Sequence, residues 1–206
     1  MKPTGGLSLE RVWRAQVHMF NYHKGLTNDT HYFRSPWYEW PLIVKPMWYY
    51  SGTEFMPEGW ISSISCMGNP AVWWTGLAAL IFMIGQSAAH LCKIAAQKSR
   101  GEAAERISRT RAFILTGFAA QYLPWVLVPR STFIYHYFAS VPFIILATVA
   151  AIKTLEGRSR KAARVAAIVL LVCALVLFIA FYPLESGLPT LRAYAKYLRW
   201  FNWYNY

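Results

Sequence analysis

The chain has 206 residues, of which 56% are hydrophobic, 17% aromatic and only 15% charged. This composition is too apolar and too aromatic for an ordinary soluble domain of this length. On a soluble protein, the formal charge of +12 would suggest nucleic acid as a partner. Here the basic residues fall in the gaps between apolar runs, where a membrane topology signal explains them better. The composition therefore predicts an integral membrane protein without a nucleic-acid partner.

The cysteines do not indicate a disulfide framework or a metal site. Cys66, Cys92 and Cys173 form no CxxC pair and lack the spacing of metal ligands. Cys92 and Cys173 fall in or beside apolar spans, so we expect buried free thiols there. No metal and no cofactor is predicted.

Residues 1–70 are expected to lie outside the membrane, beginning with an amphipathic helix at residues 7–24. One face of this helix carries Leu9, Val12, Trp13, Val17 and Phe20. Such a helix lies in the membrane interface, or it packs as a surface helix on its own protein. The first twenty residues contain no continuous apolar core and do not resemble a signal peptide.

Residues 31–50 are dense in tryptophan, tyrosine and proline. Pro36, Pro41 and Pro46 exclude a regular helix, because each removes a backbone donor and restricts the residue before it. The alternation of aromatic residues, prolines and single charges predicts an ordered loop that lies on the membrane or caps a cavity. Residues 51–65 are polar and are also expected to be a loop.

Four apolar segments follow, each close to the length that a helix needs to cross a bilayer. They cover residues 71–91, 110–129, 132–152 and 164–182. Together they form a predicted membrane domain at residues 71–183, followed by an external interfacial tail at residues 184–206. The predicted fold class is therefore an all-α integral membrane protein with four transmembrane helices, an N-terminal interfacial helix and an external loop rich in aromatic residues and proline.

Basic residues predict the orientation of these spans. Of the 21 Lys and Arg residues, eleven lie in two short connections at residues 93–111 and 153–164, which places these connections in the cytoplasm. Both termini then face outside. Seventy residues would have to be exported ahead of the first span without a signal sequence. We therefore expect this chain to be the C-terminal part of a longer polytopic protein of the plasma membrane.

The second and third spans meet at the stretch VLVPRSTFIYHYF, residues 126–138. So short a link predicts antiparallel neighbours with Arg130 at the tip. Ser131 or Thr132 is expected to cap the second helix of this hairpin, whose positive end would lie beside the arginine. With His136 nearby, this arrangement suits a phosphate at the membrane surface. The alternative is an arginine that only anchors the hairpin at the interface.

Four blocks of sequence resemble the C-terminal four-span region of bacterial protein O-mannosyltransferases, in the same order. The blocks are SPWYEWPL (35–42), KPMWYY (45–50), MGNPAVWW (67–74) and QYLPWVLVPRSTFIYHYFASVPF (121–143). The resemblance covers roughly residues 10–206, nearly the whole chain. It departs at His31-Tyr32-Phe33, where a proline is expected directly after the histidine.

The resemblance implies part of an integral-membrane glycosyltransferase of the C-type fold. Such enzymes transfer mannose from a polyprenyl-phosphate donor to Ser or Thr hydroxyls of exported proteins. The resemblance also implies that the catalytic acidic pair lies in an N-terminal half outside this chain. In agreement, the external acidic residues here form no adjacent Asp-Glu pair, and Glu39 is expected to be structural.

The resemblance directs attention to five residues as donor-binding candidates. Arg130 would neutralise the lipid phosphate as it leaves, and His136 would donate a hydrogen bond or a proton. Tyr135, Tyr137 and Trp125 would pack along the prenyl chain or the sugar; packing against neighbouring helices is the alternative for each.

Two other functions fit the sequence less well. One is a non-catalytic four-span protein that binds lipid or scaffolds a glycosyltransferase complex, which the lack of an acidic pair favours. The other is a small transporter, which requires polar residues along the mid-membrane faces. Gln86, Gln121 and Thr148 are too few for that role.

Overall fold

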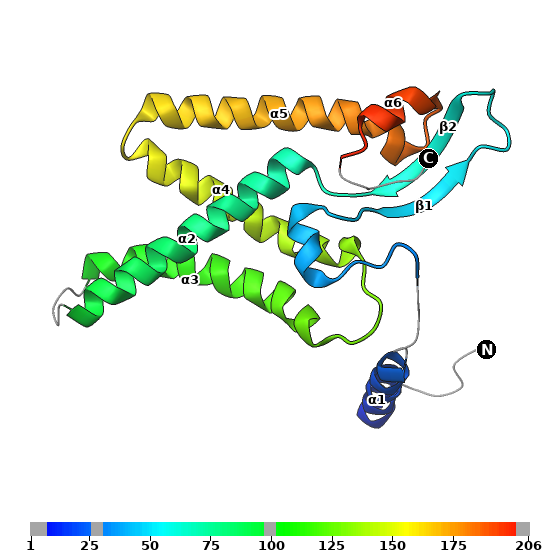
Figure 1. The fold of residues 1–206 in the computed structure, drawn as a ribbon. Helices are drawn as coiled ribbons and strands as arrows, with labels where there is room; N and C mark the ends of the chain where they lie inside the picture. Colours follow the sequence, from blue (N-terminus) through cyan, green and yellow to red (C-terminus); the bar gives the residue numbers. More distant parts are fainter. Residues whose placement is uncertain (1–7, 26–30, 97–101, 201–206) are drawn as a thin grey trace.

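The computed structural model describes residues 8–25, 31–96 and 102–200. In this part of the chain, long helices form a bundle, and a small sheet with short helices covers one end of it (Figure 1). The helical elements are α1 (Leu9–Gly25), η1 (Trp37–Leu42), α2 (Pro70–Ala96), α3 (Glu102–Tyr122), η2 (Leu123–Leu127), η3 (Ile134–Ser140), α4 (Val141–Glu156), α5 (Arg160–Ser186) and α6 (Arg192–Tyr197). The strands are β1 (Met47–Gly52), β2 (Trp60–Cys66) and β3 (Thr190–Leu191).

Three helical segments of the described residues are long and apolar enough to cross a membrane. They are Pro70–Cys92 in α2, Ile134–Glu156 through η3 and α4, and Arg160–Ser186 in α5. Helix α3 is not among them, because charged residues fill its first half and the α-helix ends at Tyr122, before Pro124. The protein is an integral membrane protein, and a fourth span through α3 and η2 stays a prediction.

The expectation of an all-α chain is wrong, because residues 47–66 form an antiparallel hairpin rather than a loop. Met47 pairs with Cys66 and Gly52 with Ser62, with a register shift between Trp48 and Tyr50. Strand β3 returns from the far end of the chain and pairs with β2, which completes the order β1-β2-β3. The sequence analysis predicted a loop here because β2 is rich in serine, which is typical of loops.

The same serines have a structural role at the end of α5. The hydroxyls of Ser63 and Ser65 each donate to the carbonyl of Leu184 at 3.1 Å, and Ser62 donates to Gly187 at 2.7 Å. The last carbonyls of a helix have no partner within the helix. Strand β2 therefore supplies the C-terminal cap of α5, and Gly187 leaves the helix with a left-handed φ of 81°.

Helix α1 lies outside the bundle of long helices (Figure 1), and much of its apolar face is exposed. Leu9, Trp13 and Phe20 are all strongly exposed. This exposure favours the membrane interface over packing on this part of the protein. Cys92 and Cys173 are also exposed on their helices, so the expectation that both are buried is wrong within the chain.

Two glycines allow close approach of the membrane helices. A Cβ atom at Gly76 of α2 would lie 2.7 Å from Cβ of Ile144 in α4, and one at Gly117 of α3 would lie 2.1 Å from the ring of Phe143. Ile144 is completely buried. Small residues at such crossings bring backbones close enough for extensive van der Waals contact. The crossing of α2, α3 and α4 therefore depends on these two positions.

We predict that Gly76→Ala destabilises the protein by about 1–3 kcal/mol, because the new methyl group overpacks the contact with Ile144. Gly85→Ala on the same helix is the matched control, since a Cβ there has no neighbour within 4 Å. The control should be neutral or slightly stabilising. Thermal unfolding in detergent measures both, and equal melting temperatures for the two variants would contradict the crossing.

Candidate functional site

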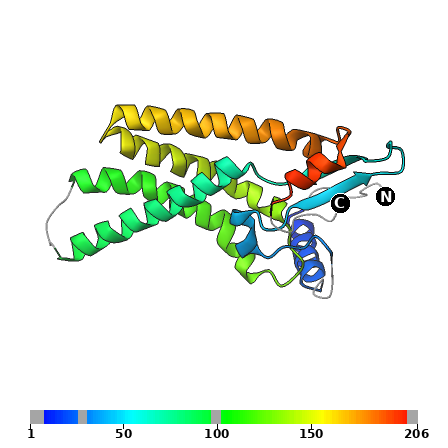
Figure 2. The ribbon, with the colours of Figure 1, turned by 45° about the horizontal axis from the view of Figure 1, so that its top comes forward.

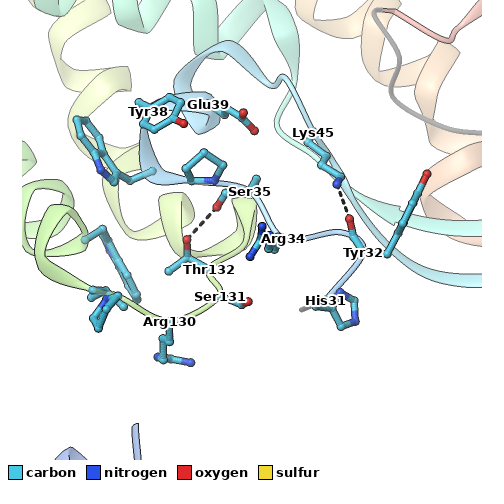
Figure 3. Close-up of a pocket in the computed structure, with 15 residues that line it drawn as sticks. His31, Tyr32, Arg34, Ser35, Tyr38, Glu39, Lys45, Arg130, Ser131 and Thr132 are labelled. Atoms are coloured by element: carbon cyan, nitrogen blue, oxygen red, sulfur yellow. Dashed lines mark hydrogen bonds between the residues drawn. The ribbon is translucent and has the colours of Figure 1, made fainter. Parts of the chain in front are cut away.

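A cavity of about 700 Å³ lies where the proline-aromatic loop meets the stretch between α3 and η3 (Figure 3). One wall comes from residues between His31 and Lys45, and the other from residues between Trp125 and Thr132. These two walls are far apart in the sequence. The elements that line the cavity lie at the sheet end of the helices in Figure 1, away from the turn between α4 and α5.

The walls are joined by a reciprocal pair of hydrogen bonds. The backbone N–H of Ser35 donates to the Thr132 carbonyl at 2.8 Å, and the Thr132 hydroxyl donates to the Ser35 carbonyl at 2.8 Å. The indole N–H of Trp40 adds bonds to the carbonyl and hydroxyl oxygens of Ser35, at 3.1 and 3.0 Å. All three side chains are buried. Buried polar groups that satisfy one another in this way fix a single geometry.

The prolines shape the first wall as the sequence indicates. Pro36 is extended, and the 3-10 helix η1 ends at Ile43, which has a left-handed φ of 56°. Tyr122 of α3 donates its hydroxyl to the Trp37 carbonyl at 2.8 Å and so attaches the loop to the bundle. The loop is thus an ordered wall of a cavity, one of the two arrangements expected for it.

The charged side chains that line the cavity are mainly cationic: Arg34, Lys45 and Arg130 against the single carboxylate Glu39. Lys45 donates to the Tyr32 carbonyl and lies 4.9 Å from the centre of the Tyr32 ring. Burial raises the pKa of Glu39, and the charge of Lys45 partly opposes this shift. A partly enclosed cavity with an excess of positive charge favours an anionic ligand.

Of the five donor-binding candidates, the structure brings only Arg130 and Trp125 to the cavity. His136 lies behind the wall: its ring is 4.1 Å from that of Trp125 and stacks on Trp40 at 5.8 Å. Its Nδ1 is within 3.1 Å of both the N–H and the carbonyl of Phe133. In this position His136 orients Trp125 and the first turn of η3.

The two tyrosines do not line the cavity either. Tyr137 is 1% exposed and packs its ring against Trp73 at 4.8 Å and Tyr122 at 5.5 Å. Tyr135 lies at the surface with its ring 4.4 Å from that of His136. For Tyr137 the geometry favours the alternative of packing against neighbouring helices.

The expectation that Ser131 or Thr132 caps a helix beside Arg130 is wrong. The N-cap residue of η3 is Phe133, and the hydroxyl of Thr132 is directed to Ser35. The α-helix itself begins only at Val141. The 3-10 helix η3 (Ile134–Ser140) therefore separates the arginine from the N-terminus of α4.

Sequence reasoning did not select His31, Arg34, Glu39 and Lys45 as site residues, although they line the same cavity. Their only signal was the spacing of single charges in a segment rich in aromatic residues and proline. The link between this segment and Arg130 is made by tertiary contacts alone.

An apolar groove of about 570 Å³ adjoins the cavity. Helix α1 contributes Met19 and Phe20 to it, and the segment after α3 contributes Leu127. Trp125, Val128, Pro129 and Arg130 line both the groove and the cavity. Arg130 therefore stands at the boundary between a cationic cavity and an apolar groove.

Comparison with known proteins identifies the family of this chain. The sequence model described as the C-terminal four TMM region of protein-O-mannosyltransferase matches residues 8–204. Dolichyl-phosphate-mannose–protein mannosyltransferase 5 of Candida albicans is 25% identical over 90% of this chain and 26% of its own length. Polyprenol-phosphate-mannose–protein mannosyltransferase of Corynebacterium glutamicum is 24% identical over 90% of this chain and 35% of its own length.

A solved structure shares the fold. The protein O-mannosyltransferase Pmt1-Pmt2 complex of S. cerevisiae, bound to the sugar donor, matches the whole chain with a TM-score of 0.79 at 20% identity. The match covers 28% of the yeast chain. This chain thus spans about a quarter to a third of the length of these three proteins. It belongs to the family of protein O-mannosyltransferase C-terminal four-transmembrane regions.

Proposed function

We propose that this chain is the donor-binding membrane part of a protein O-mannosyltransferase, which transfers mannose from a polyprenyl-phosphate donor to Ser or Thr hydroxyls of exported proteins. One observation carries the proposal: Arg130 lies where the cationic cavity meets the apolar groove. A polyprenyl phosphate has the matching order of parts, with an anionic head joined directly to an apolar chain.

In this proposal the cavity holds the phosphate and the mannose. Arg130 and Arg34 offer the planar fork of donors that suits a phosphate, and Lys45 adds a further positive charge. The phosphate gains negative charge as the bond to mannose breaks. Cations held in place by a rigid wall stabilise that charge more in the transition state than in the bound donor.

The groove holds the first isoprene units of the donor. Its walls are mostly apolar, and the helix that closes it presents an apolar face to the membrane interface. A prenyl chain entering from the bilayer would pass between α1 and the hairpin tip. Trp125 would contact the donor where its chain and head meet.

The acceptor hydroxyl needs a carboxylate as general base. The cavity has one carboxylate, Glu39, held beside Lys45 in the wall. We assign the base to an acidic pair in a preceding N-terminal half, which would close the cavity from the other side. The related topology proposal has four spans, with the cavity and both termini of this chain on the outer face of the plasma membrane.

We predict that Arg130→Ala in the complete enzyme lowers kcat/KM for the donor, because the leaving phosphate loses its main counter-charge. The activation free energy should rise by about 2–4 kcal/mol. The assay is mannose transfer from a polyprenyl-phosphate donor to a Ser/Thr-rich peptide. Arg158→Ala is the control: it removes an exposed arginine at the other end of the helices and should leave turnover unchanged. Wild-type turnover by a well-expressed Arg130→Ala variant would exclude the phosphate site.

We also predict that Phe20→Gln raises KM for a polyprenyl donor severalfold, and much less for a donor truncated to a single isoprene unit, because only the longer chain has enough isoprene units to fill the groove. Val17→Gln is the matched control, since Val17 is also an exposed apolar residue of α1 but does not line the groove. An equal change for both donor lengths would assign α1 to the membrane surface rather than to the donor.

A further inference from the structure

A second large cavity, of about 830 Å³, lies between α2, α3 and α4 near the other end of the bundle. Lys153 near the end of α4 and Gly157 just after it line this cavity, whereas Thr132, two residues before η3, lines the donor cavity. Figures 1 and 2 both place the C-terminal end of α2 and the turn between α4 and α5 at this end, opposite the sheet. The proposed donor therefore does not occupy this cavity.

The packing of the helices explains why the cavity opens here. Gly76 and Gly117 hold α2 and α3 tightly against α4 at Ile144 and Phe143, nearer the sheet end. Beyond this crossing, the α2–α3 and α4–α5 hairpins diverge (Figure 1). Small side chains on the facing surface of α4, Ala150 and Ala151, do not fill the space that results.

The walls of the cavity are apolar and lie at membrane depth. The apolar lining includes Phe82, Met83, Ile114, Leu146 and Val149, and Gln86 is a polar residue of α2 among them. The lining of α4 from Leu146 to Lys153 rises about 10 Å at 1.5 Å per residue, roughly a third of the hydrocarbon thickness of a bilayer. The upper part of an acyl chain fits such a wall, and an unfilled void of this size forfeits dispersion contacts.

The mouth of the cavity is cationic. Arg111 of α3 and Lys153 of α4 line it, together with the hydroxyl residues Thr110 and Thr154. Lys153 also contacts Glu156 at 2.8 Å, but this pair is exposed and leaves the lysine free to take a second anionic partner. Both cations belong to the two connections that hold eleven of the 21 basic residues of the chain.

We propose that this cavity binds one molecule of an anionic phospholipid, with its phosphate between Arg111 and Lys153 and its acyl chains against α2, α3 and α4. The ligand has to be amphipathic, because the charge lies at the mouth and the depth of the cavity is apolar. A bound lipid of this kind fills the space between the two hairpins and stabilises their divergence. The proposal does not depend on the function of the donor cavity.

The test measures retained lipid rather than activity. The full chain is reconstituted in nanodiscs of phosphatidylcholine with a minor fraction of phosphatidylglycerol and then released into detergent. Native mass spectrometry counts the lipids that remain bound. We expect the wild type to retain phosphatidylglycerol in preference to phosphatidylcholine, and the double variant Arg111→Gln/Lys153→Gln to retain on the order of tenfold less.

Two further variants separate a site from general attraction. Arg158→Gln removes an exposed charge at the same end that does not line the cavity, and it should retain lipid as the wild type does. Ala150→Phe keeps every charge but fills the wall, and it should lower retention. Thermal unfolding in detergent confirms that each variant is folded.

Several results would overturn the proposal. Equal loss in Arg158→Gln and in the double variant would mean diffuse attraction by the basic end of the protein. A wild type without preference for phosphatidylglycerol would mean that another occupant, such as a helix of a longer chain, fills the space. Displacement of the lipid by millimolar inorganic phosphate alone would mean a simple anion site without a role for the acyl chains.

Discussion

The reciprocal hydrogen bonds between Ser35 and Thr132 are the contact on which the cationic cavity depends. They join a loop that precedes the membrane helices to the tip of a hairpin within them, across almost a hundred residues. Trp40 stabilises this junction, because its indole N–H donates to Ser35 and its ring packs on Trp125 and His136. Without these hydrogen bonds, Arg34 and Arg130 would not be held in the walls of one cavity.

The rings behind the wall explain why so much aromatic surface collects at one end of the bundle. Trp40, Trp125 and His136 form a layer between the cavity and the buried helix ends, and Tyr122 and Tyr137 continue it into the core. Edge-to-face packing of this kind is directional. Such packing stiffens the wall, and a stiff wall is one condition for the electrostatic stabilisation that we propose for the donor phosphate.

The two ends of the helices differ in the groups that surround them. At the sheet end, backbone groups that leave the helices find partners in side chains, as Leu184 does in the serines of β2. At the basic end, the helices diverge, and charged side chains such as Arg111 and Lys153 lie beside them. Hydrogen bonds therefore build a polar cavity at the sheet end, and the divergence of the helices opens an apolar cavity at the other end. Each cavity suits a different part of the membrane.

Much of this could be predicted from the chain alone. The apolar segments and the amphipathic α1 follow from local chemistry, because a bilayer requires long helices with satisfied backbones. The resemblance of four blocks identified the family, which comparison confirmed. Arg130 was selected because a charge at a hairpin tip is conspicuous against apolar neighbours.

The rest required the tertiary structure. Strand β2 was not predicted, because its serines form hydrogen bonds with α5, which lies far along the chain. No periodicity of the sequence indicates such a contact. Tyr137 was expected at the ligand but is part of the core, since one helical turn decides which way a side chain faces. Arg34 and Lys45 join Arg130 only through the Ser35–Thr132 junction. Sequence determines which segments enter the membrane because that choice is local; which side chains share a cavity is decided by packing between distant segments.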